Sequence, residues 1–177
     1  LALAAAMDNA GTLIAADTDR GRLSRLGPRA ERAAALVAES VLLDPGRELD
    51  ALAKWRHSAD AVLVDAPCSG TGTWRRNPEA RWRLATRDLE RFAGTQKRLL
   101  EIASELVRQG GRLIYVVCSL LDAEGPDQIA AFLAVRPDWR AAPLELPLGS
   151  PRGTGVRLTP FHDGTDGFFI ARLEKPC

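Results

Sequence analysis

The sequence predicts an α/β fold, in which strands alternate with helices and a hairpin closes the chain. Short apolar runs of strand type are separated by stretches with helical periodicity, whereas the last two runs are joined only by a polar turn. This order is typical of a three-layer sandwich with a mostly parallel sheet and a C-terminal antiparallel hairpin. The runs are 12–16, 41–43, 61–64, 112–117, 156–159 and 167–173.

Length and composition indicate one domain, residues 1–177, with an ordinary globular core. Hydrophobic residues make up 46% and charged residues 27% of the chain. No apolar run approaches the ~20 residues of a membrane span, so no membrane partner is expected. The net charge of +1 neither supports nor excludes a nucleic-acid partner. Three cysteines without framework spacing predict a reducing compartment, and hence the cytoplasm.

The first helix, residues 1–7, has no initiator Met, cap or strand before it, so we expect the sequence to start inside a larger protein. A second helix begins near Arg20, is interrupted at Gly27-Pro28 and resumes over 30–38. Residues 48–55 are also helix-like.

The clearest helix spans residues 88–108, and Gly110-Gly111 is predicted to end it. A further helix covers 122–135, and the Pro- and Gly-rich stretch 143–154 is predicted to form loops. The periodic positions of the clearest helix are Leu89, Phe92, Gln96, Leu99, Leu100, Ala103 and Leu106.

Two thiols follow predicted strands directly, Cys68 after 61–64 and Cys118 after 112–117. The carboxyl ends of parallel strands open onto one edge, where ligands bind, so the two thiols can meet there. A single such cysteine is more often a small buried hydrophobe, but two at equivalent positions favour function. Zinc needs about four ligands, and His57 and His162 lack metal-ligand spacing to these cysteines, so no metal site is predicted.

Two acids also follow strands. Asp17 could accept hydrogen bonds from ribose hydroxyls, or else cap the helix near Arg20, for which Asp19 or Thr18 would serve equally. Asp44 could reach a base, although its Asp-Pro-Gly context favours a turn.

Arginines and a tryptophan follow the first thiol closely. Guanidinium groups of Arg75, Arg76 and Arg81 can bind phosphates, and Trp82 can stack on a base. The alternative is a solvated helix start with Trp82 packed on the core.

The motifs resemble those of the Sun (Fmu) family of RNA (cytosine-5)-methyltransferases over nearly the whole chain. Asp65-Ala-Pro-Cys-Ser-Gly-Thr-Gly72, followed by Arg-Arg-Asn-Pro, resembles the family's fourth motif. Tyr115-Val-Val-Cys-Ser-Leu120 resembles the sixth, and Asp166-Gly-Phe-Phe-Ile-Ala171 is similar to the final strand. Asp17 matches the acid after the second strand.

The resemblance implies a Rossmann-like methyltransferase fold that uses S-adenosylmethionine to methylate carbon 5 of cytosine in RNA, with ribosomal RNA favoured. Cys118 would be the nucleophile that attacks carbon 6, and Cys68 would assist the later elimination. Asp65 would hold the cytosine ring, and the flipped or single-stranded base would be reached at the sheet edge.

For the cofactor, the resemblance implies binding by Asp17, Asp44, Asp65 and Pro67. The family's Gly-rich cofactor loop would precede Leu1, so the fold is expected to be truncated at its N-terminus.

Two other functions stay open. A methyltransferase acting on an exocyclic nitrogen would need no thiol, and a non-catalytic RNA-binding module on the same fold would keep only the arginines. The sequence is silent on oligomeric state.

Overall fold

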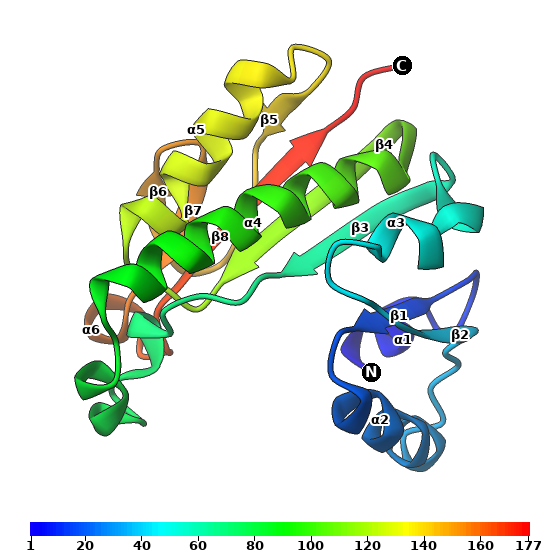
Figure 1. Cartoon of the computed structure of the whole chain (residues 1–177), viewed down its shortest axis with the longest axis horizontal. Coiled ribbons are helices and arrows are strands. Elements are labelled where there is room, and N and C mark those ends of the chain that lie inside the picture. The colour runs from blue at the N-terminus through cyan, green and yellow to red at the C-terminus, as the bar shows by residue number, and fades with distance from the viewer. The chain divides into compact units, whose positions relative to one another are not determined.

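A computed structural model describes residues 1–177, which form two compact units, Leu1–Lys54 and Trp55–Cys177 (Figure 1). No helix in either unit combines the length and apolar character that a membrane span requires. Strands and helices alternate through most of the chain, which confirms the predicted α/β fold.

The first unit is built on a parallel strand pair, with Ile14 opposite Glu39. A helix connects the two strands, as parallel pairing requires. The elements of this unit are α1 (Ala2–Ala6), β1 (Ile14–Asp17), α2 (Arg20–Arg32), β2 (Glu39–Leu42) and α3 (Glu48–Ala51), with the 3₁₀ turn η1 (Ala53–Trp55) at its border.

Helix α2 corrects the prediction of a break at Gly27-Pro28, because it is continuous with Pro28 inside it. Pro28 lacks an N–H to donate and its ring crowds the carbonyl group four residues earlier, yet the helix continues to Arg32. The predicted helix over 30–38 is also wrong beyond Arg32. Asn9 explains this end, because its side chain binds the carbonyl oxygen of Ala34 and the amide of Leu36, each at 2.8 Å.

The second unit contains a six-stranded mixed sheet, in the order β3-β4-β8-β7-β6 with β5 on β8. Only β3 and β4 are parallel here, and β8 runs antiparallel to β4. The expected closing hairpin is present as β7 and β8. The sheet is therefore less parallel than predicted, since β5 and β6 add further antiparallel pairs. The strands are β3 (Ala59–Asp65), β4 (Val107–Val117), β5 (Arg140–Ala142), β6 (Ser150–Arg152), β7 (Gly155–Leu158) and β8 (Phe168–Glu174).

Two long helices lie on the same face of this sheet (Figure 1). The predicted helix 122–135 divides at Gly125, and Pro126 takes the first position of α5, where its missing N–H costs nothing. The predicted loop 143–154 includes β6. The helices are α4 (Thr86–Leu106) and α5 (Pro126–Val135), with the short turns η2 (Thr71–Thr73), η3 (Pro78–Trp82), η4 (Asp122–Glu124) and α6 (Pro160–Asp163).

Gly110-Gly111 does not end α4 as predicted, because the helix ends at Leu106 and the chain enters β4 at once. The two glycines form an irregularity of the strand instead. Gly110 takes φ +72°, and its amide donates to Lys175, whose own amide donates to Gly111. Backbone pairing with the end of β8 therefore decides this segment, which helical periodicity cannot reveal.

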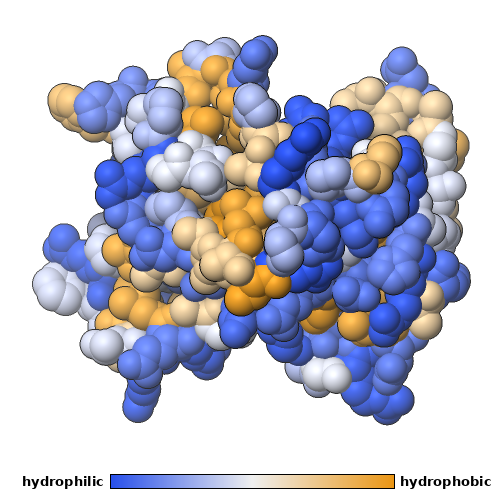
Figure 2. Space-filling view, turned by 90° about the horizontal axis from the view of Figure 1, so that it is seen from above, coloured by the Kyte–Doolittle hydropathy of each residue, from blue (hydrophilic) through white to orange (hydrophobic).

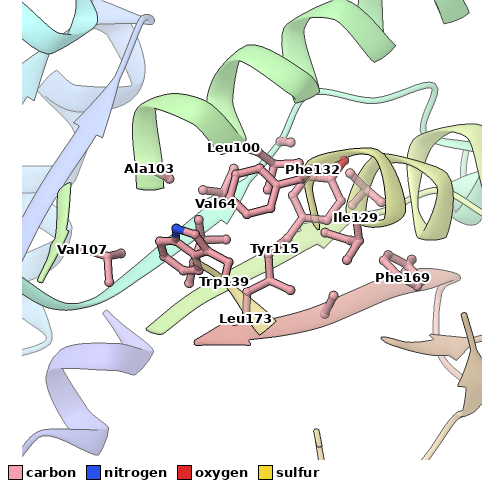
Figure 3. Packing of buried hydrophobic residues seen from close by; sticks show 14 residues of the cluster. Val64, Leu100, Ala103, Val107, Tyr115, Ile129, Phe132, Trp139, Phe169 and Leu173 are labelled. Atoms are coloured by element: carbon pink, nitrogen blue, oxygen red, sulfur yellow. The ribbon is translucent and has the colours of Figure 1, made fainter. Parts of the chain in front are cut away.

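The core lies between the sheet and the helices α4 and α5. Alternate residues of β4 and β8 point into it and are completely buried. Figure 3 shows side chains from both helices meeting this face, with the rings of Phe132 and Trp139 edge to face at 5.7 Å. The buried strand residues are Leu113, Tyr115, Val117, Phe169, Ala171 and Leu173.

Polar residues dominate much of the surface, and Figure 2 shows separate hydrophobic patches among hydrophilic residues on one face. The two most exposed large apolar side chains are those of Phe161 and Trp82, at 90% and 78%.

Two glycines bring the turn after β3 against the start of β8. The amide of Gly167 donates to the carbonyl of Gly72 at 2.8 Å, and the amide of Gly72 donates to the carbonyl of Cys118 at 3.1 Å. A β-carbon on Gly72 would lie 2.6 Å from the carbonyl carbon of Gly167, so only glycine fits this approach.

We predict that Gly72→Ala lowers the free energy of unfolding by about 1–3 kcal/mol, because the added methyl group overpacks a backbone contact. Gly94→Ala is the matched control, since Gly94 lies inside α4 with nothing within 4 Å of its added β-carbon. That control should stabilise by about 0.5–1 kcal/mol. Urea unfolding followed by circular dichroism measures both, and equal effects of the two variants would contradict the close approach.

Candidate active site

A pair of thiols lies at the carboxyl edge of the parallel strands, with the sulfur atoms of Cys68 and Cys118 3.4 Å apart. Both residues are partly buried. The pair follows from the register of β3 on β4, in which Asp65 lies opposite Val116, because each thiol comes shortly after these positions. The structure thus confirms that two cysteines distant in sequence meet at one sheet edge.

One proton is shared unequally between the two sulfur atoms. The hydrogen bond from Cys68 lowers the pKa of Cys118 to about 7, against the opposing effects of burial and of the charge on Asp65. The same hydrogen bond, followed by burial, raises the pKa of Cys68. Cys118 is therefore the more acidic thiol, ionised in part near neutral pH, and Cys68 is the thiol that donates to its thiolate form.

Asp65 and Pro67 flank the same edge. Asp65 is the last residue of β3 and is exposed, and its charge acts on Cys118. The carbonyl oxygen of Pro67 accepts a hydrogen bond from the side chain of Gln96 at 3.0 Å. The carboxylate of Asp65 is therefore accessible to a ligand, whereas the hydrogen bond from Gln96 fixes the backbone of Pro67.

A buried carboxylate under the thiols was not predicted. Glu124 is only 1% exposed and accepts hydrogen bonds from the amide and the hydroxyl of Ser69 and from the side chain of Gln96. The sequence offered one signal for it. Gln96 occupies a periodic position of α4 among apolar residues, and a buried amide there requires a polar partner.

Three hydroxyl groups extend this network. The oxygen of Ser119 lies 3.3 Å from that of Ser69 and 3.1 Å from that of Thr71, which also accepts the amide of Leu120 at 2.8 Å. These contacts join the loop after β3 to the loop after β4. No spacing rule pointed to them, because each bond connects residues about 50 positions apart.

Arg75 and Arg76 both bind Asp166, which precedes β8 in a turn to which the sequence assigned no chemistry. The guanidinium of Arg76 lowers the pKa of this carboxyl group. The carboxylate is 11% exposed, whereas the two arginine side chains remain 57% and 58% exposed. Asp166 therefore orients two cations that stay available to solvent.

Arg81 is exposed and lies over the ring of Trp82, 4.5 Å from its centroid. Trp82 is itself 78% exposed, which excludes the alternative that it packs on the core.

Asp17 and Asp44 lie in the first unit. Asp17 ends β1 and accepts the amide of Asp19 at 2.9 Å, while Asp19 caps α2 by accepting the amide of Arg22. The capping role thus falls to Asp19. Asp44 is exposed after β2, and its carbonyl accepts the amide of Arg47 at 2.9 Å, as the expected turn requires.

Comparison with known proteins gives consistent matches. The model of the family described as 16S rRNA methyltransferase RsmB/F matches residues 2–174. Ribosomal RNA small subunit methyltransferase B of Xanthomonas campestris is 40% identical over 164 residues, which is 92% of this chain and 37% of that protein. The protein of the same name from Thermus thermophilus is 45% identical over 118 residues, covering 66% of this chain and 29% of the relative.

Solved structures agree. The crystal structure of NSun6 from Pyrococcus horikoshii with SFG superposes with a TM-score of 0.84 and 28% identity, over 98% of this chain and 44% of that one. A methyltransferase homologue from the same organism gives 0.80 and 30%, over 98% and 56%.

The chain spans less than half the length of the two curated relatives. The match nevertheless runs over nearly all of its residues, including both thiol motifs. The Rossmann-like methyltransferase fold and the family expected from the motifs are thereby confirmed: this chain belongs to the 16S rRNA methyltransferase RsmB/F family.

Proposed function

We propose that the protein of which residues 1–177 form the catalytic domain transfers a methyl group from S-adenosylmethionine to carbon 5 of cytosine in RNA, with ribosomal RNA as the substrate. The observation that carries this proposal is the thiol pair, one member a thiolate and the other its proton donor, 3.4 Å apart at a strand edge. The names of the relatives support an RNA substrate and, with SFG, a cofactor of this class.

The first step is the addition of Cys118 to the base. Carbon 5 of cytosine is a poor nucleophile until a soft thiolate adds to carbon 6, which forms the S–C bond and moves the ring electrons toward carbon 5 and the ring nitrogen. Exposed Asp65 lies at the same edge and would hold the polar edge of the ring. Carbon 5 then takes the methyl group, for which S-adenosylmethionine is the electrophilic donor.

Elimination is the task of Cys68. While Cys118 is a thiolate, it accepts a hydrogen bond from the thiol of Cys68. This hydrogen bond raises the pKa of Cys68, so Cys68 stays protonated. Formation of the adduct consumes the Cys118 charge and so removes this cause. Cys68, which is only partly buried, can then release its own proton to solvent and accept the proton of carbon 5. The electrons of that C–H bond restore the ring double bond, the S–C bond breaks, and Cys118 leaves as a thiolate.

The acids at the strand ends fit the cofactor. Asp17 and Asp44 follow neighbouring parallel strands of the first unit, and carboxylates at such ends accept hydrogen bonds from ribose hydroxyls and base amines. In the second unit Asp65 is the last residue of β3, and Pro67 lies two residues after it. We propose that these four residues contact S-adenosylmethionine.

Neither alternative function explains the thiol pair. A methyltransferase for exocyclic nitrogens or a non-catalytic RNA-binding module would have no use for a thiolate with its own proton donor. The arginines and exposed Trp82 are compatible with all three functions, so they do not discriminate.

The proposed function predicts a covalent bond between Cys118 and RNA. In the full-length protein, Cys68→Ser should accumulate a protein–RNA adduct, because the elimination is blocked. Incubation with cellular RNA and S-adenosylmethionine, followed by a denaturing gel, should show a slow, nuclease-sensitive band that is absent in the Cys68→Ser/Cys118→Ala double variant. Cys177→Ser is the control, since Cys177 is exposed at the C-terminus and should turn over normally. Methyl transfer by the Cys118→Ala variant would refute the assignment of Cys118 as the nucleophile.

The second prediction concerns pH. Because the hydrogen bond from Cys68 lowers the pKa of Cys118 to about 7, alkylation of Cys118 by iodoacetamide should rise with pH around that value. In Cys68→Ala the donor is gone, so the profile should move up toward the ordinary thiol value of 9.0. Peptide mass spectrometry resolves each cysteine. An unchanged profile in the variant would show that Cys68 does not set the acidity.

RNA binding gives the third prediction. Replacing Arg75 and Arg76 by glutamine removes two exposed cations, so affinity should fall and the salt slope should become shallower by about 1.4 for a single strand. The control is Arg140→Gln, an arginine of similar exposure that pairs with Glu174 at the opposite end of the sheet. Filter binding at several salt concentrations measures both. Equal slopes for the two variants would make Arg75 and Arg76 structural.

A further inference from the structure

We propose that Glu124 is a positioning residue, whose buried carboxylate holds the loop of Cys68 against the loop of Cys118 so that the two thiols stay paired. Its value for catalysis rests on the proposed function, whereas the holding role concerns the thiols alone and can be tested without methyl transfer.

The carboxylate of Glu124 is connected by hydrogen bonds to the Cys68 loop on both sides of the cysteine. It accepts the amide of Ser69 at 2.8 Å and also the hydroxyl of that residue. On the other side, the amide group of Gln96 bridges it at 3.3 Å to the carbonyl oxygen of Pro67 at 3.0 Å. Residues 67 and 69 are therefore both fixed, and Cys68 lies between them.

The backbone of Glu124 is anchored to the segment that carries Cys118. Its carbonyl oxygen accepts the hydroxyl of Tyr115 at 2.7 Å, and Tyr115 lies in β4 three residues before Cys118. Its amide donates to Leu121 at 3.2 Å, and the amide of Leu121 donates to the hydroxyl of Ser119. Glu124 thus connects the two thiol-bearing loops through one rigid turn.

The charge of Glu124 gives no reason of its own for this residue. A carboxylate that is 1% exposed is expensive to bury, and all its hydrogen-bond donors are neutral. That charge, like the charge of Asp65, raises the pKa of Cys118 and so opposes the thiolate. Because the electrostatic effect is unfavourable for a nucleophile, the benefit lies in the geometry that the hydrogen bonds maintain.

The loss of the hydrogen bonds and the loss of the charge in Glu124→Ala predict opposite shifts in the pKa of Cys118, so the variant distinguishes between the two effects. Loss of a negative charge alone would lower the pKa of Cys118. Loss of the holding contacts would separate the thiols and remove the hydrogen bond from Cys68, the largest cause of the low value, so the pKa would rise from about 7 toward 9.0. The other titratable groups that interact with the pair are Asp65, Tyr115 and Arg76, which substitutions of Glu124 leave in place.

The experiment measures alkylation of Cys118 by iodoacetamide against pH in the full-length protein, with thermal unfolding as the check on folding. In Glu124→Ala we expect the midpoint to rise by about one unit or more, as expected when a thiol loses its stabilising donor. In Glu124→Gln an acceptor for the Ser69 amide is kept and the charge is lost, so the midpoint should stay or fall. Exposed Glu90→Ala on α4 is the matched control and should change nothing.

A lower or unchanged midpoint in folded Glu124→Ala would overturn the proposal. If that variant does not fold, Ser69→Ala replaces it. This variant keeps the contact of the Ser69 amide with Glu124 and removes the hydroxyl contacts with Glu124 and Ser119, so it should raise the midpoint by a smaller amount. An unchanged midpoint in Ser69→Ala would then overturn the proposal.

Methyl transfer separates this idea from the proposed function. If Glu124 positions the thiols, Glu124→Ala should lower kcat by about 100-fold with RNA affinity unchanged, as a displacement of about 1 Å can do. If the native protein transfers no methyl group while the alkylation results hold, the proposed function fails and the positioning role remains.

Discussion

The parallel pairing of β3 with β4 is the constraint on which the candidate site depends. Its register places Asp65 opposite Val116, and the two chain segments leave the sheet side by side, each with a cysteine in the next few residues. A slip of one residue would turn the buried side chains of β4 to the other face of the sheet, so burial of these side chains stabilises this register. The packing of the hydrophobic core thus brings the two cysteine-bearing loops side by side, where the sulfur atoms lie 3.4 Å apart.

Beyond the ends of β3 and β4, polar contacts connect the two loops that follow these strands. Ser69, Thr71, Ser119 and Glu124 connect the two loops, and the approach of Gly72 to Gly167 adds the start of β8 to the same cluster. Neutral donors around a buried carboxylate fix directions without a compensating cation. The result is a pair in which the proton donor and the more acidic thiol are distinguished by their surroundings alone, since both are cysteines.

Asp166 pairs with two arginines without covering them. Its carboxylate, which is 11% exposed, orients Arg75 and Arg76, whose side chains remain more than half exposed. An exposed arginine that is already oriented loses less conformational freedom when it binds a phosphate, so its ion pair with Asp166 does not argue against an RNA contact. Arg81 and Trp82 extend the exposed cationic and aromatic character of this loop.

The α/β class, the family and the meeting of Cys68 and Cys118 could all be predicted from the sequence, because they rest on periodicity and on motifs that are contiguous in the chain. Long-range contacts decided the rest. Pairing with Lys175 turned Gly110-Gly111 from a helix end into a strand irregularity, and Asn9 ended α2 early. Glu124 was hidden within a predicted helix, since its partners lie 28 and 55 residues away and only the folded chain brings them together.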